Sequence, residues 1–473
     1  MKPFSIYNTL TRSVDELRPG NPPDVSFYSC GPTVYLAQHL GNLRCYLCWD
    51  FLRRALELDG FKVRHVMNVT DVGHMTSDED EGEDKIEKTA REQGKTPLEI
   101  ANFYLAMFKR DCATLNILPP HVWSRATEHI PEMIALTERI IAAGYAYVTP
   151  SAVYFDVEKW RGPSRVGRLS RQSLDEQHSA QRLEHSPDKR SPHDFALWFL
   201  NKPNHIMQWE SPWGRGYPGW HIECSAMSMK YLGETIDIHT GGVDHIPIHH
   251  ENEIAQSESA TGHQFVRCFV HNAWLVDRSG AKISKSSGKF PLLADVVASG
   301  IDPLAFRLFC FGAKYRSEVA LSGEALHAAQ SNLEYFREFA RALDDDAANS
   351  ADSPWSAEFA GRFLDGLVND LNTPQALAVA LELIAESYRR KDSRIWQSLR
   401  EFDRVLGLGL EQVRAAARGS VIPAEIQALI DQRGAARRAR DFARADELRK
   451  RIEDAGYEIK DNRDGSATYT RRS

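Results

Sequence analysis

Two short polar clusters in the sequence could bind a nucleotide. His39-Leu40-Gly41-Asn42 places an imidazole and an amide three residues apart around a glycine, so a flat base could approach the backbone while the polar side chains face a phosphate. Lys282-Ile283-Ser284-Lys285 places two ammonium groups three residues apart beside hydroxyls, and this set could offset charge that develops on a triphosphate. Taken alone, the first cluster is more often a plain helix start, and the second is more often a solvated loop.

A third set of residues has the donor atoms of a metal site. The set is Cys30, Cys224, His249 and Glu253. His249 and Glu253 are four residues apart, so they share one face of a helix. With the two thiolates they could complete a tetrahedral zinc site. From spacing alone, a structural or incidental role for these residues is the alternative.

The C-terminal segment is basic. From Arg433 to the end of the chain there are twelve Lys and Arg against eight Asp and Glu, although the whole chain carries a net charge of −7. Arginines recur there at spacings of three, four and seven, which makes one helix face cationic, as phosphate contacts require. These arginines are Arg433, Arg437, Arg440, Arg444 and Arg451. A solvated face is the alternative, with pairs such as Glu447 and Arg451 neutralising part of it.

The elements that must position these clusters begin with a βαβ unit. Val25–Cys30 predicts a strand, a helix follows from about Asn42 to Leu58, and Lys62–Val69 predicts a second strand. Ligands of a doubly wound parallel sheet lie beyond the carboxyl ends of its strands. We expect Cys30 and Thr70 at those ends.

A second half of the sheet is predicted later in the chain. Thr235–Thr240 and Phe265–Val276 predict strands, with a helix over Ile248–Ser259 between them. Between the two halves, Pro97–Gly144 predicts helix, and Arg161–Pro192, rich in charge, Ser and Gln, predicts an insertion or a long loop.

The remainder of the chain is predicted to be mainly helical. Pro303–Leu406 predicts a helical bundle. After it, Ala424–Gln432 and Ala439–Asp454 predict a helical pair, and Tyr457–Tyr469 predicts a short strand-like end.

Length and composition limit the class of protein. A chain of 473 residues predicts roughly three domains of about 150 residues. Hydrophobic residues at 42% and charged residues at 26% are typical of a globular protein and exclude a disordered or fibrous one. No apolar run reaches the roughly eighteen residues that span a bilayer, and the N-terminus has no secretory signal, so we expect a cytoplasmic protein without membrane contact. Seven scattered cysteines argue against a disulfide framework.

The two nucleotide clusters, in this order and about 240 residues apart, resemble the two signatures of class I aminoacyl-tRNA synthetases. The resemblance implies a nucleotide-binding sheet split by an insertion, amino-acid activation with ATP, and transfer to the terminal ribose of tRNA. The usual first signature has a second histidine where this chain has Asn42, and the second usually has methionine where Ile283 stands. Asn42 can donate a hydrogen bond but cannot be cationic.

Longer strings resemble the cysteinyl-tRNA synthetase family, from SIYNTLTR at the start, through YSCGPTVY and GWHIECSAMSMKYLGETIDIHTGG, to the tail. The resemblance implies one zinc ion per chain, bound by Cys30, Cys224, His249 and Glu253. It also implies a cysteine pocket that contains Thr70, Trp220 and His239. A borderline-soft metal prefers a thiolate to the hydroxyl of serine and lowers the thiol pKa, so such a site needs no editing domain.

The resemblance further implies an enzyme that joins L-cysteine to tRNA(Cys) in two ATP-dependent steps, with Mg²⁺ accompanying ATP and a monomer as the working unit. The expected ATP-binding residues are Thr33, His39, Gly41, Asn42, Lys282, Ser284 and Lys285. Of these, His39, Asn42, Lys282 and Lys285 are expected to be catalytic, through positioning and electrostatic stabilisation.

The expected fold class is therefore α/β: a Rossmann-like doubly wound parallel sheet split by an insertion, then a helical bundle, then a small C-terminal mixed α/β region that recognises the anticodon. The expected boundaries are 1–110 and 201–300 for the two catalytic halves, 111–200 for the connective insertion, 301–420 for the helical stem and bundle, and 421–473 for the anticodon-binding region.

Three neighbouring features are expected to lie outside this chemistry. Cys45 and Cys48 form a C-x-x-C pair inside an apolar helix and are expected to be buried, inert thiols. His250 is expected to point away from the site. His74 and the acidic run 77–84 predict a solvated acidic loop, with ATP-linked magnesium as the alternative.

Two rival functions remain open from the sequence. A related class of ligase attaches activated cysteine to an amino sugar with the same zinc and ATP elements, but it lacks the distal anticodon region. An RNA-binding relative without ligase activity is the second rival, because Asn42 departs from the signature.

Overall fold

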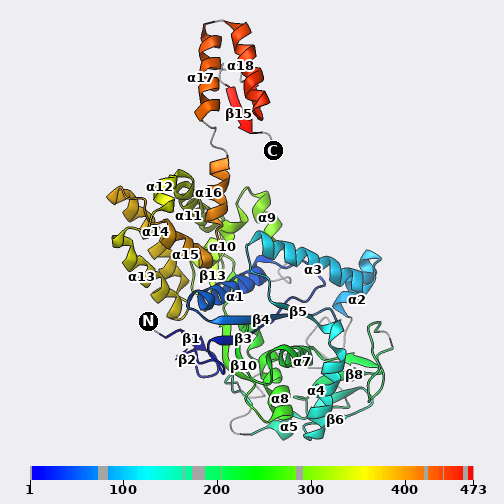
Figure 1. Cartoon of the computed structure of the whole chain (residues 1–473). Coiled ribbons are helices and arrows are strands. Elements are labelled where there is room, and N and C mark those ends of the chain that lie inside the picture. The colour runs from blue at the N-terminus through cyan, green and yellow to red at the C-terminus, as the bar shows by residue number, and fades with distance from the viewer. Residues whose placement is uncertain are drawn as a thin grey trace. The chain divides into compact units, whose positions relative to one another are not determined.

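The computed structural model describes residues 3–72, 84–162, 166–172, 187–203, 205–283, 291–419, 424–439, 441–461 and 467–471. The chain divides into two compact units, one formed by residues 1–333 and 351–408 and the other by residues 334–350 and 409–473. Each unit is described by itself below, and Figure 1 labels the elements along the chain.

A five-stranded parallel sheet forms the centre of the first unit. Its strand order is β11-β10-β3-β4-β5, and every neighbouring pair is parallel. The strands are β3 (Asp24–Ser29), β4 (Lys62–Val69), β5 (Val122–Arg125), β10 (Ile236–Gly242) and β11 (Val266–Asn272). This arrangement confirms the predicted doubly wound parallel sheet, with β3 and β4 from the first half of the chain and β10 and β11 from the second.

The two halves of the sheet meet where β10 pairs with β3, with Ile238 opposite Phe27 and Thr240 opposite Ser29. Helices α1 (Leu40–Leu58) and α3 (Pro97–Thr114) lie on one side of the sheet, and α7 (Trp220–Leu232) and α8 (His249–Thr261) lie on the other (Figure 1). The connection after β3 leads through α1 to β4 on one side of it in the sheet, and the connection after β10 leads through α8 to β11 on the other side. The carboxyl ends of these two strands form the switch point at which ligands of such sheets bind.

The insertion between the halves has its own antiparallel sheet, which the sequence patterns did not predict. Its strands are β6 (Ala146–Val148), β7 (Ala152–Phe155), β8 (Phe195–Leu200) and β9 (Gly216–Pro218). Helix α4 (Ile130–Ala142) contributes Met133, Leu136 and Ile140 to a buried apolar cluster with Val153 and Phe155. No helix or strand lies in the described part of the stretch 161–192, in agreement with the predicted loop.

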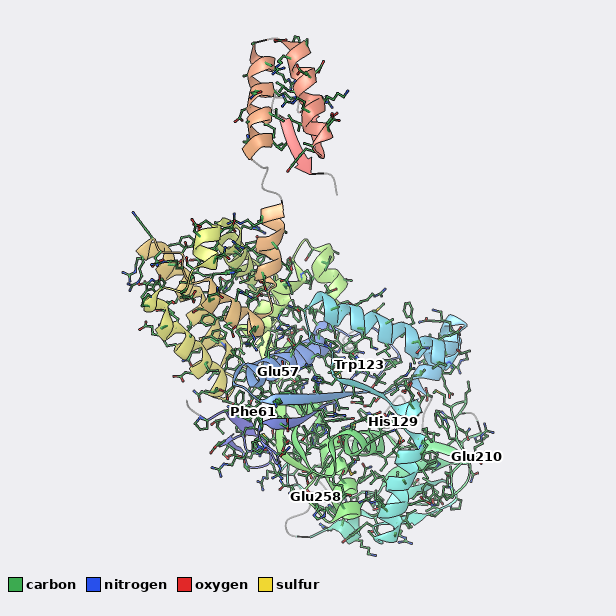
Figure 2. The ribbon with its side chains drawn as sticks, in the orientation of Figure 1. Glu57, Phe61, Trp123, His129, Glu210 and Glu258 are labelled. Carbon is green, nitrogen blue, oxygen red and sulfur yellow. The ribbon has the colours of Figure 1, made fainter. Side chains whose placement is uncertain are left out.

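The prediction of continuous helix over Pro97–Gly144 is wrong. After α3 the chain forms β5, a one-turn helix η1 (Ala126–Glu128) and then α4. His129 lies at the junction before α4. Its Nδ1 donates a hydrogen bond to the Arg125 carbonyl at 2.6 Å, and its Nε2 shares one with the Tyr231 hydroxyl at 2.8 Å. Trp123 on β5 and His129 are labelled in Figure 2. A strand of four residues is too short to interrupt the helical spacing of its neighbours, which explains the error.

A bundle of helices follows the sheet and confirms the predicted helical region. Its helices in the first unit are α9 (Leu293–Ala298), α10 (Pro303–Phe311), α13 (Ala357–Val368), α14 (Thr373–Arg390) and α15 (Trp396–Leu406), and α11 (Gly323–Ala342) begins there. The smaller elements of this unit are β1 (Ser5–Asn8), β2 (Ser13–Glu16), α2 (Lys85–Gln93), α5 (Val157–Trp160), η2 (Val243–His245), β12 (Leu275–Val276), β13 (Val319–Ala320) and η4 (Pro354–Ser356).

The second unit contains α12 (Asp345–Asn349), α16 (Leu410–Gly419), α17 (Ala424–Arg438), α18 (Phe442–Asp454) and the antiparallel pair β14 (Tyr457–Asp461) and β15 (Ala467–Arg471). The C-terminal elements share a small apolar core of Ile426, Ile452, Tyr457 and Ile459. A helical pair followed by a strand-like end was predicted for this segment, and both are present.

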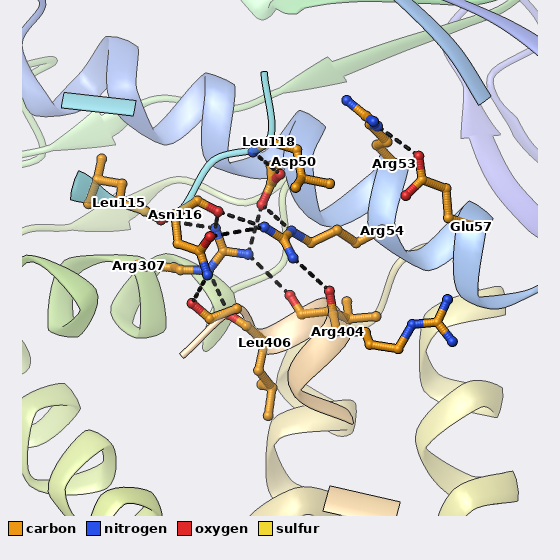
Figure 3. A network of polar contacts seen from close by, with 12 residues as sticks. Asp50, Arg53, Arg54, Glu57, Leu115, Asn116, Leu118, Arg307, Arg404 and Leu406 are labelled. Atoms are coloured by element: carbon orange, nitrogen blue, oxygen red, sulfur yellow. Dashed lines mark hydrogen bonds and ion pairs between the residues drawn. The ribbon is translucent and has the colours of Figure 1, made fainter. Parts of the chain in front are cut away.

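A buried network of charged side chains joins α1 to the helical bundle (Figure 3). Asp50 on α1 pairs with Arg54 at 2.8 Å and with Arg307 of α10 at 2.7 Å, and all three side chains are nearly or fully buried. Arg307 also donates to the carbonyls of Leu406 at 2.5 Å and Leu115 at 3.1 Å. Burial alone would raise the pKa of Asp50, but the guanidiniums of Arg307 and Arg54 lower it below its ordinary value. Asp50 is therefore ionised within the network.

Replacing Asp50 by alanine should destabilise the protein strongly. Two guanidiniums would remain buried without their carboxylate, and breaking such a pair costs about 3–5 kcal/mol of unfolding free energy. Urea denaturation at pH 7 measures the loss. E382A is the control, because it breaks a solvent-exposed pair with Arg362 and should shift the midpoint little. Equal midpoints for D50A and E382A would contradict the importance of the network.

Candidate functional site

A cavity of about 240 Å³ lies at the carboxyl ends of β3, β4 and β10. Its lining brings together residues that the sequence analysis selected from both halves of the chain. These are Cys30, Thr33, Asn42, Thr70, Trp220, Cys224 and His249. The switch point of the sheet therefore carries a pocket in which both predicted halves take part.

Cys30, Cys224, His249 and Glu253 converge at the floor of this region. Cys30 directly follows β3, Cys224 lies on α7, and the other two lie one turn apart on α8. One ligand atom from each residue lies within 4.8 Å of all the others, and all four side chains are buried. His249 Nε2 and Glu253 Oε1 are 3.0 Å apart. Two sulfurs, an imidazole and a carboxylate at these separations fit the donor set of a tetrahedral zinc ion.

Protonation within this group is uneven. The contact with Cys224 lowers the pKa of Cys30 well below its ordinary value, and the same contact raises the pKa of Cys224. Burial would lower the pKa of His249, but the charge of Glu253 raises it to about 10. Burial would raise the pKa of Glu253, but His239 and His249 lower it to about 2. The site without metal therefore holds protons on Cys224 and His249 at neutral pH.

His239 contacts the carboxylate of Glu253 and so orients it. His239 Nε2 lies 2.8 Å from Glu253 Oε2, and both side chains have no exposed surface. His239 is not among the residues described as lining the cavity, whereas Thr70 and Trp220 are. His239 therefore contacts a candidate metal ligand, Glu253, rather than the described lining of the cavity.

The expectation that His250 points away from the site is wrong. Its Nε2 lies 3.4 Å from the sulfur of Cys30, and His250 belongs to a second overlapping group of possible ligands with Cys30, His239 and Glu253. Burial keeps the pKa of His250 well below its ordinary value, so its ring is neutral. Adjacent residues on a helix usually face different directions. This end of α8 is buried on most sides, so the side chains of His249 and His250 are both enclosed by other parts of the protein.

Thr70 and Trp220 both line the cavity. The Thr70 hydroxyl donates to Glu223 Oε2 at 3.0 Å and accepts from Asn68 at 3.1 Å. The ring of Trp220 lies 4.8 Å from that of His249. Asn68 was missed in the sequence. Its amide oxygen accepts a hydrogen bond from Gly31 at 2.6 Å, and a Cβ at Gly31 would lie 1.8 Å from the Asn68 carbonyl. A polar residue near the end of an otherwise apolar strand was the available signal.

The first nucleotide signature forms the start of α1. His39 is the N-cap, and its Nδ1 accepts a hydrogen bond from the backbone N–H of Asn42 at 3.2 Å. The Asn42 side chain donates to Gln38 at 2.6 Å. A Cβ on Gly41 would lie 2.9 Å from the His39 ring and 3.3 Å from the Ile283 carbonyl. Glycine therefore permits the close approach of the chain that carries the second signature.

Of the second signature, the structure describes Lys282 and Ile283, while Ser284 and Lys285 lie outside the described residues. Lys282 Nζ pairs with Asp244 at 2.7 Å and lies 5.0 Å from the centre of the Trp274 ring. Asp244 also lines the cavity. The two signatures, distant in sequence, thus border one site.

The remaining expectations have mixed outcomes. Cys48 is buried on α1 and burial raises its pKa to about 12, as predicted for an inert thiol, whereas Cys45 is only half-buried and borders the cavity. His74 and residues 77–83 lie outside the described residues, and Asp84 caps α2 through the Glu87 N–H.

In the C-terminal segment, Arg433 is 3% exposed, so it does not belong to an exposed cationic face. Glu447 pairs with Arg444, three residues before it, at 2.5 Å, whereas the predicted partner Arg451 lies four residues after it. Arg440 lies outside the described residues. The exposed basic face is therefore smaller than the sequence spacing predicts.

Comparisons with known proteins agree on one family. The profile described as "tRNA synthetases class I (C) catalytic domain" matches residues 16–331, and the "Cysteinyl-tRNA ligase anticodon binding domain" matches residues 420–471. Cysteine--tRNA ligase 1 of Burkholderia lata is 43% identical over 469 residues, which cover 99% of this chain and 97% of the relative. Cysteine--tRNA ligase of Chlorobaculum tepidum is 41% identical over the full length of both chains. The chain belongs to the cysteinyl-tRNA synthetase family.

Solved structures support the fold of this cysteinyl-tRNA synthetase family member. Methionyl-tRNA synthetase of Mycobacterium tuberculosis, in complex with methionyl-adenylate, superposes with a TM-score of 0.57 at 15% identity, covering 89% of this chain and 96% of that one. The resemblance stated from the sequence, the class I fold and the family are therefore confirmed. Among the described residues, no helix is long and apolar enough to cross a membrane.

Metal affinity should rise steeply with pH. A metal held by the four-residue cluster would need the thiolate of Cys224 and the neutral ring of His249, and the raised pKa values of both groups favour their protonated forms at pH 7. Release of two protons predicts that the dissociation constant for Zn²⁺ falls about 100-fold per pH unit between pH 6 and 8. Competition with a chromophoric chelator measures it. A pH-independent constant would show that these two groups are not ligands.

Proposed function

We propose that this cysteine--tRNA ligase selects its amino acid through a zinc ion held by Cys30, Cys224, His249 and Glu253, with the single chain as the working unit. The enzyme activates L-cysteine with ATP and transfers it to the 3′-terminal ribose of tRNA(Cys). The observation that carries the zinc proposal is the convergence of four buried donor groups within 4.8 Å at the edge of the cavity.

The donor set explains the choice of substrate. When bound, zinc would supply a borderline-soft Lewis acid that bonds to the substrate thiolate in preference to a hydroxyl. Serine has nearly the same shape as cysteine, and a pocket that relies on shape alone rejects such an isostere poorly. Among the chain's own groups, Trp220 and Thr70 border the cavity at the substrate site. His239 acts through its 2.8 Å contact with Glu253 and holds that carboxylate in place.

Activation is an in-line displacement on ATP. A carboxylate oxygen of cysteine forms a bond to the α-phosphorus, the bond from that phosphorus to the bridging oxygen breaks, and pyrophosphate leaves. His39, Asn42, Lys282 and Lys285 are proposed to align the phosphates and stabilise the charge, together with Mg²⁺. Thr33, Gly41 and Ser284 complete the proposed ATP site. The position of Asn42 on the cavity wall and the ion pair of Lys282 with Asp244 beside it support these roles.

In the second step, the terminal ribose hydroxyl of the tRNA attacks the carbonyl carbon of the adenylate, and AMP leaves. The segment from residue 421 onward is proposed to bind the anticodon, because the anticodon-domain profile matches residues 420–471. That match also argues against the rival ligase that acts on an amino sugar, since such ligases lack this region. The proposed boundaries of the other domains are those expected from the sequence.

Amino-acid activation should depend on the metal site of the enzyme and on the thiol of the substrate cysteine. Cysteine-dependent exchange of pyrophosphate into ATP should be lost in C224S and after chelation, and kcat/KM for serine should be on the order of 10⁴-fold lower than for cysteine. C112S is a matched control, since Cys112 is also buried but lies on α3. Full exchange by metal-free protein would exclude the zinc proposal, and no exchange by metal-loaded protein would favour a non-catalytic relative.

Removing the C-terminal region should separate the two steps. A chain ending at Gly419 retains the sheet and the cavity, so pyrophosphate exchange should persist. Charging of a tRNA(Cys) transcript should fall by about 100-fold or more in kcat/KM, because the contacts to the anticodon region are lost. Unchanged charging would show that the tail does not bind the tRNA.

A further inference from the structure

Arg44 has an unusual set of partners for a buried charge. It is the fifth residue of α1, two residues after Asn42, and its side chain has no exposed surface. The guanidinium donates to the carbonyl of Ala273, to that of Trp274 at 3.0 Å, to that of Lys314 at 3.3 Å and to that of Ser317 at 2.7 Å. Within the described part of the chain, no carboxylate forms an ion pair with it. Both terminal nitrogens of this buried cation thus bind carbonyl oxygens, while its Nε has no hydrogen-bond partner, so the contacts of Arg44 fix backbone rather than side chains.

The four carbonyls belong to the two segments that lead into one small sheet. Ala273 and Trp274 immediately precede β12, while Lys314 and Ser317 precede β13, and β12 and β13 pair in parallel. The N–H of Val319 donates to the Trp274 carbonyl at 3.2 Å, and that of Ala273 donates to the Tyr315 carbonyl at 2.9 Å. One side chain from α1 thus holds the start of both strands.

This small sheet carries Lys282. Residue Val276 of β12 forms a bridge with Lys282, and the Ile283 N–H donates to the Leu275 carbonyl at 3.0 Å. Lys282 also lies over the ring of Trp274, whose carbonyl Arg44 binds. A shift of the Ala273–Trp274 backbone would therefore move Lys282 directly.

The first signature, two residues before Arg44 on the chain, also contacts the region of the second signature. The N–H of Leu40 donates to the Pro291 carbonyl at 3.0 Å, and Gly41 permits the approach of the Ile283 carbonyl. These backbone contacts hold Ile283, within the second signature, and Pro291, after it, against the start of α1. Arg44 adds the only guanidinium among the described residues that bridges α1 to the entry of β12.

We propose that Arg44 is a positioning residue for cysteine activation, which fixes the separation between the His39–Asn42 turn and Lys282. The proposal rests on the proposed ATP-binding roles of these residues. The planar guanidinium has five N–H donors in a fixed fork, so it can hold carbonyls from two segments at once. Lysine has three donors on a single atom and cannot span the same acceptors. A displacement of about 1 Å in such a group can cost on the order of 100-fold in rate.

The test compares R44K with the matched variant R54K. Arg54 lies on the same helix, is also buried, and donates to the carbonyls of Arg404 at 2.8 Å and Asn116 at 2.7 Å, but it contacts neither signature. Zinc content, thermal midpoint and the kinetics of pyrophosphate exchange are measured for both. We expect both variants to lose stability, while only R44K loses about 10- to 100-fold in kcat for exchange, with KM for cysteine and zinc content unchanged.

A double-mutant cycle with K282A shows whether Arg44 acts through Lys282. If it does, R44K should cost much less in the K282A background than in the wild type, because the aligned group is already absent. Additive effects, or equal loss of kcat in R44K and R54K, would overturn the proposal. R44Q provides a second variant, and failure of both Arg44 variants to fold while R54K folds would assign a purely structural role. Absence of exchange in the wild-type enzyme would instead contradict the proposed function.

Discussion

Parallel pairing between β3 and β10 is the constraint on which the site depends. It joins two segments more than 200 residues apart and places Cys30 at the end of one strand beside the helix that follows the other. Helices α7 and α8 then bring Cys224, His249 and Glu253 to the same point. A shift of this pairing by two residues would move Cys30 by more than about 6 Å, because a strand rises about 3.3 Å per residue, and would separate the four donor groups.

Several buried polar groups under the cavity are connected to one another. A series of hydrogen bonds runs from the Cys30 sulfur through His250 and His271 to the Thr9 hydroxyl, with separations of 3.4, 2.8 and 2.8 Å. Burying such groups is costly unless each has a partner. Thr9, directly after β1, therefore stabilises the neutral histidines that lie beside the candidate metal ligands.

Much of this arrangement could be predicted from the sequence, and the failures have physical causes. The βαβ units were predictable because buried parallel strands are continuous apolar runs. Helix α7 was not predicted, because seven consecutive residues from Ile222 to Ser228 are buried and so leave no amphipathic period. The donor residues were identifiable by type and by family resemblance. The contact of His250 with Cys30 was not, because helical spacing describes a helix with one solvent face, whereas α8 is enclosed. Arg44 gave no signal either, since its partners are backbone carbonyls.

The cap formed by His39 also determines what that ring can offer to a ligand. Because Nδ1 accepts the Asn42 N–H, only Nε2 of this ring is left to donate a hydrogen bond to a ligand. The first signature therefore presents one imidazole nitrogen in a direction that the helix cap fixes. The asparagine amide at the neighbouring signature position is an uncharged donor, so it can add a hydrogen bond but no charge to this half of the nucleotide site.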